Sequence, residues 1–590
     1  MKNLAPRFGA LIACAALAAC AHSNAQVASG GSGPQVGTAA GDYLAARHAQ
    51  SEQDTKLAAA LYARALSDDP GSPELMAKTF QLLATSGQFD RAVPIARRIV
   101  AQNPGAGLPS LVVIADDVRQ HHYDAASSTA ATLPDEGLLA IVRPLVVAWI
   151  DAGLGNKAAA EAALQPLAAH PGFNLFGDFH KALIDDLLGD QAGARAAFDR
   201  AAAANKAQFV RVTVAAGSFY ERTGDREAAK KLYEAYGKAH PDTQLMQSAL
   251  ARIAAGTAPP RMIGSAEDGL AESFFDVAGL LHQERMNDIG MILAQLSLHL
   301  KPDFAMAKLL IADLYESEHH LASAIATFES IDHAAPVSWS ARVRAAILRA
   351  DSGHVDDAVK RLQEMAEERP QRSDALVALG DVLRGASRFP EAVKAYDRAV
   401  ARIPDLQQRD WSILYARGIA LERSDQWPRA EADFLKALEL QPNQPYVLNY
   451  LAYSWVEKGI HLKRAQAMLE RALQLRPNDP QIVDSMGWAL FHLGRYSGAV
   501  THLEKAVELS PEDAVINDHL GDAYWRAGRY NEARYQWNRA LRMDPEPELV
   551  ASLENKIAHG LKPRAAGHSA SGNKGASKSS AAVSLPRRGS

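Results

Sequence analysis

Two copies of one structural unit follow each other in the sequence: PQIVDSMGWALFHLGRYSGAVTHLEKAVELSP at residues 480–511 and AVINDHLGDAYWRAGRYNEARYQWNRALRMDP at residues 514–545. Both copies have glycine at their eighth position, Gly-Arg-Tyr near the middle and proline at the end. The repeat extends towards the N-terminus, because prolines recur at intervals of 34, 34, 34, 38, 35, 34 and 34 residues: Pro302, Pro336, Pro370, Pro404, Pro442, Pro477, Pro511 and Pro545. Such a fixed period is typical of proteins built from stacked repeats.

Small residues accompany the prolines and predict what each repeat contains. A small residue lies 24 or 25 positions before each proline: Ala278, Ala312, Ala346, Gly380, Gly418, Ala452, Gly487 and Gly521. Two helices of a hairpin can pack closely only where side chains are small. Proline then ends the second helix, because it has no N–H to donate and its ring clashes with the preceding turn. The sequence therefore predicts one helical hairpin per repeat.

This pattern resembles the tetratricopeptide repeat, which implies an all-α superhelical solenoid. Weaker copies of the pattern, such as Ala46, Ala58 and Pro70, add roughly six degenerate repeats before residue 254 and bring the total to about 14 hairpins. We expect an N-terminal degenerate segment at 42–253 and a C-terminal segment at 270–561. Residues 254–269, AAGTAPPRMIGSAEDG, contain Gly and a Pro pair, so they form either a hinge or linker, or an ordered loop within one continuous superhelix.

The N-terminus resembles a bacterial lipoprotein signal. Lys2 and Arg7 flank a short apolar stretch that ends in Leu17-Ala18-Ala19-Cys20. The resemblance implies a signal peptide at 1–19, cleavage before Cys20 and lipidation of its thiol. An ordinary secretory signal, cut near Ala25, is the alternative.

The residues after the expected cleavage site predict the cellular location of the protein. Ala21 follows the cysteine, where aspartate is the usual inner-membrane retention signal of enterobacterial lipoproteins. We therefore expect a lipid-anchored protein on the outer membrane that faces the periplasm. Residues 20–41, rich in Ser, Gly, Ala and Gln, are expected to be a flexible tether.

Charge and composition exclude several functions. The formal net charge is −5 at pH 7, and the expected disordered tail at 562–590 contains six basic residues and no acid, so the folded body is more acidic still. An acidic body argues against nucleic acid as a partner. The only cysteines are Cys14 and Cys20.

No motif for enzymatic chemistry is present. The sequence has no glycine-rich phosphate loop, no Gly-x-Ser-x-Gly, no His-Glu-x-x-His and no Cys-x-x-Cys. The adjacent pairs His121-His122 and His319-His320 fall at predicted loops without a third ligand nearby. We therefore predict a non-enzymatic protein with no catalytic residue, no metal and no cofactor.

A stripe of aromatic and polar residues is the predicted binding site. In tetratricopeptide repeats the first helix of each hairpin lines the groove, and in the last repeats its groove positions hold Tyr446, Asn449, Tyr453, Asp484, Trp488, Asp518, Asp522, Trp525 and Arg526. Aromatic stacking and exposed carboxylates that accept hydrogen bonds would hold a bound peptide. The alternative is that Trp488 and Trp525 only pack between neighbouring hairpins.

The last repeats also resemble large proteobacterial tetratricopeptide-repeat outer-membrane lipoproteins. The matching motifs are NYLAYS at 449–454, DSMGW at 484–488 and NDHLGDAYW at 517–525. This family includes adaptors of carboxyl-terminal processing proteases, so the resemblance implies a scaffold that binds such a protease and brings peptidoglycan hydrolases to it. An alternative is a structural or assembly subunit of an envelope machine for exopolysaccharide export or pilus assembly.

Overall fold

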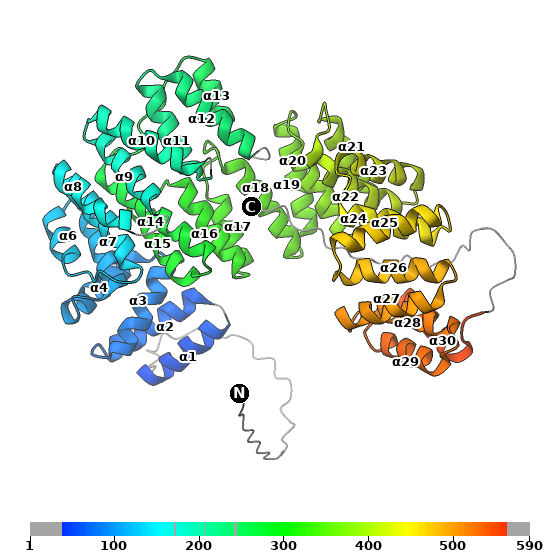
Figure 1. Cartoon of the computed structure of the whole chain (residues 1–590). Coiled ribbons are helices and arrows are strands. Elements are labelled where there is room, and N and C mark those ends of the chain that lie inside the picture. The colour runs from blue at the N-terminus through cyan, green and yellow to red at the C-terminus, as the bar shows by residue number, and fades with distance from the viewer. Residues whose placement is uncertain (1–37, 53, 170–172, 207, 241–244, 563–590) are drawn as a thin grey trace, which may run out of the picture. The chain divides into compact units, whose positions relative to one another are not determined.

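The computed structural model describes residues 38–52, 54–169, 173–206, 208–240 and 245–562, and all regular structure within them is helical (Figure 1). Fourteen consecutive pairs of helices follow one another in these residues: six pairs from α1 to α12 and eight pairs from α14 to α29. Helices α13 and α30 are single. The chain divides into two compact units between Pro109 and Ser110. The prediction of about 14 helical hairpins is therefore confirmed.

The first unit contains two complete helix pairs: α1 Ala39–Ser51, α2 Thr55–Asp68, α3 Pro73–Thr85 and α4 Phe89–Gln102. The helices α1 and α2 meet through an edge-to-face contact between the rings of Tyr43 and Tyr62, whose centroids are 5.7 Å apart. Ala46, Ala58 and Ala65 are completely buried in this unit, as expected for the small positions of a degenerate repeat.

The N-terminal half of the second unit includes three helices of only eight residues, α6, α8 and α13, and a 3-10 turn, η1, at Gln165–Ala169. Its α-helices are α5 Gly107–Arg119, α6 Tyr123–Ala130, α7 Leu139–Gly153, α8 Lys157–Leu164, α9 Asn174–Leu187, α10 Gln191–Asn205, α11 Val210–Arg222, α12 Arg226–Ala239 and α13 Gln247–Ala254.

The eight regular pairs follow, with a second 3-10 turn, η2, at Gln408–Asp410. They are α14 Ala266–Gln283, α15 Asn287–Leu300, α16 Ala305–Ser317, α17 Leu321–Glu329, α18 Ser338–Asp351, α19 Val355–Glu368, α20 Asp374–Gly385, α21 Phe389–Ala401, α22 Trp411–Arg423, α23 Trp427–Leu440, α24 Pro445–Glu457, α25 Leu462–Leu475, α26 Pro480–His492, α27 Tyr496–Leu509, α28 Ala514–Arg526 and α29 Tyr530–Leu541, before α30 Pro547–His559.

The predicted close contacts within a hairpin are confirmed. A Cβ atom added to Gly521 would lie 2.5 Å from the ring of Trp537, and one added to Gly487 would lie 2.6 Å from Leu503. The turns are where the Gly-Arg-Tyr tripeptides predict them, with Gly494 and Gly528 at φ values of +75° and +81° that favour glycine. In these two repeats the first helix therefore approaches its second helix through a missing side chain.

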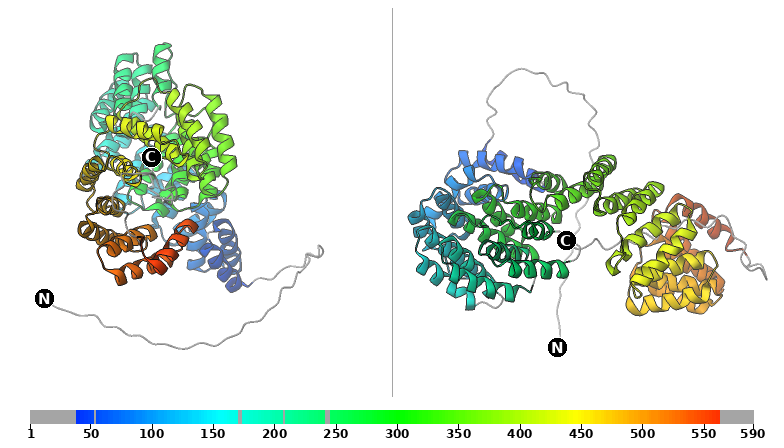
Figure 2. Two further views of the ribbon diagram at one scale, coloured as in Figure 1. Left: turned by 90° about the vertical axis from the view of Figure 1, so that its right-hand side faces the viewer. Right: turned by 90° about the horizontal axis from the view of Figure 1, so that it is seen from above.

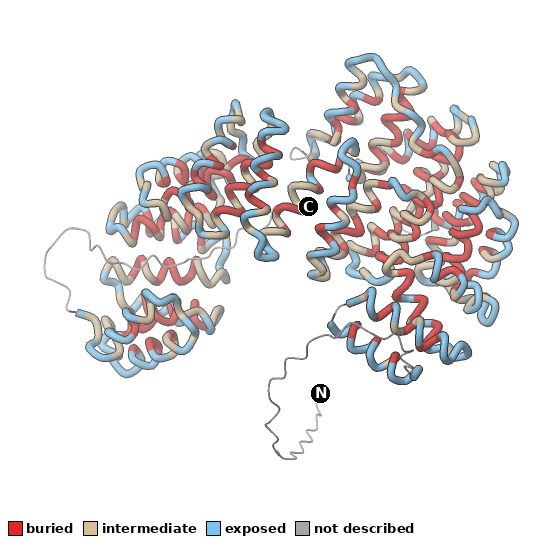
Figure 3. The backbone as a smooth tube through the Cα atoms, turned by 180° about the vertical axis from the view of Figure 1, so that it is seen from behind, coloured by how far each residue is buried: buried red, intermediate tan, exposed pale blue. Residues whose placement is uncertain are grey.

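Apolar burial is continuous along the C-terminal repeats. One cluster of buried side chains runs from Trp339 to Leu553, and it has no large centre, because each pair packs on the next. Buried residues face the neighbouring helices and exposed residues face outwards (Figure 3). Figure 2 shows the same helix pairs from two further directions.

The expected linker at 254–269 consists of the last residue of α13, the loop 255–265 and the first turn of α14. Its backbone is bound at several points: Arg226 donates to the carbonyl of Gly256, and the Ser218 hydroxyl donates to the carbonyl of Pro260 over 3.3 Å. Ile263 is 2% exposed. The loop is thus packed on α11 and α12, and whether it bends as a hinge stays a prediction.

Several predicted segments lie outside the described residues. These are the signal peptide at 1–19, Cys20, the tether up to residue 37 and the tail from residue 563 onwards. Within the described ranges, no helix is long and apolar enough to span a bilayer.

Candidate functional site

The predicted groove residues lie on three successive first helices, α24, α26 and α28, and α30 occupies the place of a fourth. We call these four helices the C-terminal row. Asp479 caps α26 by accepting from the backbone N–H of Gln481 over 3.1 Å, and Asp513 caps α28 by accepting from Val515 over 2.9 Å. Proline begins α24, α26 and α30, where its missing N–H is not needed. Helix capping therefore sets the register that brings the side chains of the row together.

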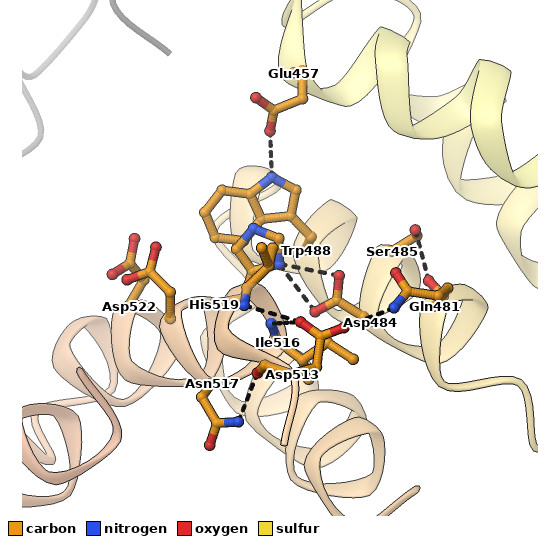
Figure 4. A network of polar contacts seen from close by, with 12 residues as sticks. Glu457, Gln481, Asp484, Ser485, Trp488, Asp513, Ile516, Asn517, His519 and Asp522 are labelled. Atoms are coloured by element: carbon orange, nitrogen blue, oxygen red, sulfur yellow. Dashed lines mark hydrogen bonds and ion pairs between the residues drawn. The ribbon is translucent and has the colours of Figure 1, made fainter. Parts of the chain in front are cut away.

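An ion pair between the second and third helices of the row is stacked on an indole. His519 Nδ1 lies 3.0 Å from Asp484 Oδ1, and both side chains are almost fully buried. The His519 ring stacks on Trp488 with 3.9 Å between centroids and 13° between planes. The Trp488 indole N–H donates to Glu457 at the end of α24 (Figure 4). Three helices of the row are thus joined by one chain of polar contacts.

Electrostatics holds His519 in its charged form. Burial alone would lower its pKa, but the negative charge of Asp484, its hydrogen bond and the charges of Asp518 and Glu457 together raise the pKa to about 9. The imidazolium is therefore present at neutral pH and gives the stacking with Trp488 a cation–π character.

A second ion cluster joins the third helix of the row to the fourth. The ammonium of Lys556 lies 2.8 Å from both oxygens of Asp518 and 2.9 Å from Asp522. The indole N–H of Trp537 also donates to Asp522, over 2.9 Å. Burial raises the pKa of Asp522 to about 6, and repulsion from Asp518 adds to this rise, although Lys556 opposes it. The two carboxylates and Lys556 form a buried cluster with its own internal partners.

The expectation that Asp484, Asp518 and Asp522 are exposed acceptors is wrong. They are 3%, 6% and 5% exposed, and they already accept from His519, Lys556 and Trp537. The reason is the repeat geometry, which places groove positions of one first helix against a cation on the next. Whether the predicted residues bind a partner stays a prediction.

The remaining predicted residues keep part of their surface. Tyr446, Tyr453, Trp488, Trp525 and Arg526 are half-buried, so part of each side chain stays accessible to solvent. The guanidinium of Arg476 lies 5.6 Å from the Tyr446 ring centroid. Among the described residues, the buried Oδ1 of Asn449 accepts no hydrogen bond. The α24 part of the row therefore offers aromatic surface, whereas Asn449, predicted as a groove residue, is buried and only 5% exposed.

Sequence reasoning missed His519, Lys556 and Glu457. A signal existed for Lys556, because Trp488, Asp522 and Lys556 are spaced by one 34-residue repeat and so occupy equivalent places on α26, α28 and α30. Lys556 nevertheless follows the last repeat proline, Pro545, where the repeat pattern ends.

A second polar network covers the equivalent face of the N-terminal helices. The Trp149 indole donates to His180 Nδ1 over 3.0 Å, and His180 Nε2 lies 3.3 Å from Asp276 of α14. Because an indole only donates, Nδ1 must accept and the proton must be on Nε2. Asp276 is buried, which raises its pKa to about 6 against the opposing effect of His180. The network attaches α14 to α7 and α9.

Two further contacts attach α14 to α11 and to α7. Arg211 of α11 donates to Glu272 of α14 over 2.6 Å, and Glu272 is 1% exposed. A Cβ atom added to Gly269 would overlap the ring of Trp149. The first helices α7, α9 and α11 are therefore covered by a helix of the chain itself.

Across the described ranges, no group of three or more His, Cys, Asp or Glu side chains is arranged to hold a metal ion. His121-His122 and His319-His320 lie in the turns between α5 and α6 and between α16 and α17, as predicted.

Comparison with protein families finds repeats of one kind. Models described as tetratricopeptide repeat match residues 49–108, 215–243, 343–406, 415–480 and 514–547, and a model described as TPR repeat matches 487–528. No curated protein matches the chain significantly.

Solved structures of similar fold are distant in sequence. A tetratricopeptide repeat protein from Parabacteroides merdae is 15% identical, with a TM-score of 0.36, and the match covers 43% of this chain and 98% of that one. The APC/C hetero-tetramer Cut9-Hcn1 is 14% identical, with a TM-score of 0.37 and 88% and 96% coverage. PilF of Pseudomonas aeruginosa is 18% identical, with a TM-score of 0.31 and 37% and 97% coverage. Scores this low carry no information about partners.

Proposed function

Because this chain is an all-α tetratricopeptide-repeat solenoid, we propose that its C-terminal row captures a segment of a partner protein. Tetratricopeptide repeats generally serve as non-catalytic scaffolds for protein–protein interaction. The observation that carries the proposal is that α14 covers N-terminal first helices, whereas no described helix covers α24 and α26 in this way. Helix α14 packs on α7 and α9 and is joined to α11 by the Arg211–Glu272 ion pair, whereas among the described helices α24 and α26 pack extensively only on the helix pairs next to them in the chain.

The row offers aromatic surface to an extended chain or a helix. Tyr446, Tyr453 and Trp488 are half-buried and spaced along two neighbouring first helices, α24 and α26. Rings held in this way bind with little loss of side-chain entropy. The carboxylates serve differently, because their contacts with His519 and Lys556 hold the row in register.

We further propose that the scaffold is a lipoprotein of the outer membrane that faces the periplasm. The resemblance of residues 17–20 to a lipoprotein signal supports this location, as does Ala21 after the lipidated cysteine. Acyl chains on Cys20 would hold the protein at the membrane, because each buried methylene contributes about 0.8 kcal/mol. Residues after Cys20 would then separate the solenoid from the lipid surface.

The partner that we propose is a carboxyl-terminal processing protease together with the peptidoglycan hydrolases it degrades. The motifs behind this resemblance, 449–454, 484–488 and 517–525, lie on α24, α26 and α28 and thus within the C-terminal row. A scaffold with this surface would bring enzyme and substrate together and raise their effective concentration.

The half-lives of peptidoglycan hydrolases in cells test this function. Deletion of the scaffold is expected to lengthen the half-lives of its client hydrolases, and Tyr446→Ala with Tyr453→Ala is expected to have the same effect. Tyr535→Ala is the matched control, because this tyrosine is 66% exposed on α29, outside the row. Unchanged half-lives together with a defect in polysaccharide export or pilus assembly would contradict the adaptor and favour an assembly subunit.

A further inference from the structure

We propose that two copies of this chain exchange their last helix, α30, so that Lys556 of each copy pairs with Asp518 and Asp522 of the other. The inference does not depend on the proposed partner. It rests on how α30 is held, on the backbone of the segment that connects it and on the fit of its seat.

The seat of α30 is formed by Asp518, Asp522 and Trp525 of α28 and by α29. Lys556 enters between Asp518 and Asp522, which are 6% and 5% exposed. Beyond this pair, Gly560 lies directly against the Trp525 ring, where no Cβ atom would fit. Any helix with the sequence of α30 fits this seat, whichever copy supplies it. Charge and shape therefore select α30 without requiring that it belong to the same chain.

Apart from that seat, helix α30 packs extensively only on α29. Leu553 is its only buried residue. The half-buried side chains of Leu549 and Ile557 also pack on the core of the C-terminal repeats, and Arg534 donates to the carbonyl of Ile557 over 3.4 Å. Because α30 is the last described helix and packs extensively on one neighbour, it can open locally without unpacking the other repeats. Release of α30 thus leaves the rest of the solenoid folded.

The connection between α29 and α30 is strained in the unexchanged form. It has five residues, 542–546, and Asp544 has a φ of +50°, in the left-handed region that favours glycine. Pro545 follows directly, and a residue before proline favours extended backbone. With Pro547 at the start of α30, the sequence Asp-Pro-Glu-Pro prefers an extended path. Short strained connections of this kind favour exchange of an element between copies.

Extension of this connection relieves the strain and moves α30 away from its own seat. Five extended residues reach about 17 Å, enough to place the helix on a neighbouring copy. The exchange is reciprocal under two-fold symmetry, since each copy gives one helix and receives one. The last member of each C-terminal row then belongs to the other chain.

Mass-marked copies test the exchange in the full chain. One copy carries Ala558→Ser beside Lys556, the other carries Glu512→Asp on the segment before Asp518, and both substituted positions are exposed. The copies are co-expressed and treated with a carbodiimide, which joins a contacting amine and carboxylate without a spacer. We expect peptides joining Lys556 to Asp518 or Asp522 that carry both marks. Detection only of joined peptides from single copies would overturn the proposal.

Substitution of Asp544 distinguishes exchange of α30 from nonspecific contact between copies. Asp544→Gly removes the strain of the unexchanged form and should lower the ratio of doubly marked to single-copy peptides at least about tenfold. Asp544→Ala, which keeps the strain, should leave the ratio equal or higher. Equal ratios in the two variants would overturn the strained connection as the cause of exchange.

Discussion

The imidazole of His519 lies 3.9 Å from the indole of Trp488 and nearly parallel to it, while its Nδ1 is 3.0 Å from Asp484. These contacts join α26 to α28 through one buried cation. They also make the stability of the C-terminal repeats depend on the charge of a single histidine.

The first prediction concerns pH. The pKa of His519 is raised from 6.5 to about 9 in the folded chain, so its stabilising contribution is complete below pH 6.5 and is lost as the pH rises through 9. The loss amounts to about 3 kcal/mol at most. Urea unfolding followed by tryptophan fluorescence should show decreasing stability across this range.

His519→Gln is the control for this pH dependence, since glutamine does not titrate. The pKa of Asp522 is raised from 3.8 to about 6 in the folded chain, so Asp522 also stabilises the folded state at low pH. This contribution is lost as the pH rises to about 6, before the range in which the contribution of His519 is lost. If the pH dependence of stability between 6.5 and 9 persists in His519→Gln, a group other than His519 causes it.

The second prediction concerns the buried cluster around Lys556. Asp518→Asn with Asp522→Asn leaves the Lys556 ammonium without a charged partner and should destabilise the C-terminal repeats by about 1–3 kcal/mol. Adding Lys556→Met should restore part of that loss, because no unpaired charge is then left. Glu554→Gln, an exposed change on the same helix, should stay within about 0.5 kcal/mol. Additive effects of the carboxylate and lysine changes would argue against the cluster.

The third prediction concerns helix contact within a hairpin. Gly487→Leu and Gly521→Leu push a side chain into Leu503 or Trp537 and should each cost about 1–3 kcal/mol or more. Gly385→Ala is the matched control, because a Cβ atom added there meets nothing within 4 Å. Equal melting temperatures for the leucine variants and the control would refute the repeat register.

The repeat register could be predicted from the sequence, because it depends on local spacing. Proline at the end of a hairpin and glycine opposite Trp537 or Leu503 restrict each repeat by themselves. The position of α14 on α7, α9 and α11 could not be predicted, since Gly269 and Trp149 meet only through the path of many repeats. No local pattern encodes that path.

The candidate site was predicted in part. The aromatic and polar residues lie on the expected helices, but the exposure of Asp484, Asp518 and Asp522 depends on side chains of the next helix. His519 belongs to a neighbouring repeat, and Lys556 lies beyond the last repeat proline. Whether a polar residue is buried therefore depends on side chains of the neighbouring repeat. The pattern within one repeat does not predict these contacts.

The fourth prediction concerns anchoring. Cys20→Ser removes the thiol that would carry the lipid, so the protein should leave the outer-membrane fraction and lose metabolic labelling with a fatty acid. Alanine in place of Ser23, beyond the expected cleavage site, is a control that keeps the thiol. Retention of label and of membrane flotation by Cys20→Ser would contradict the lipoprotein proposal.

Photo-crosslinking in cells from single positions of the solenoid tests the central claim, that the C-terminal row captures a protein, most directly. Benzoylphenylalanine replaces Tyr453 in the row or Tyr535 on the outside of α29, and both substitutions keep an aromatic side chain. We predict covalent adducts with the processing protease or a client hydrolase from position 453 and none from position 535. Adducts from position 535 alone, or from neither position in cells that contain the protease and its clients, would contradict the assignment.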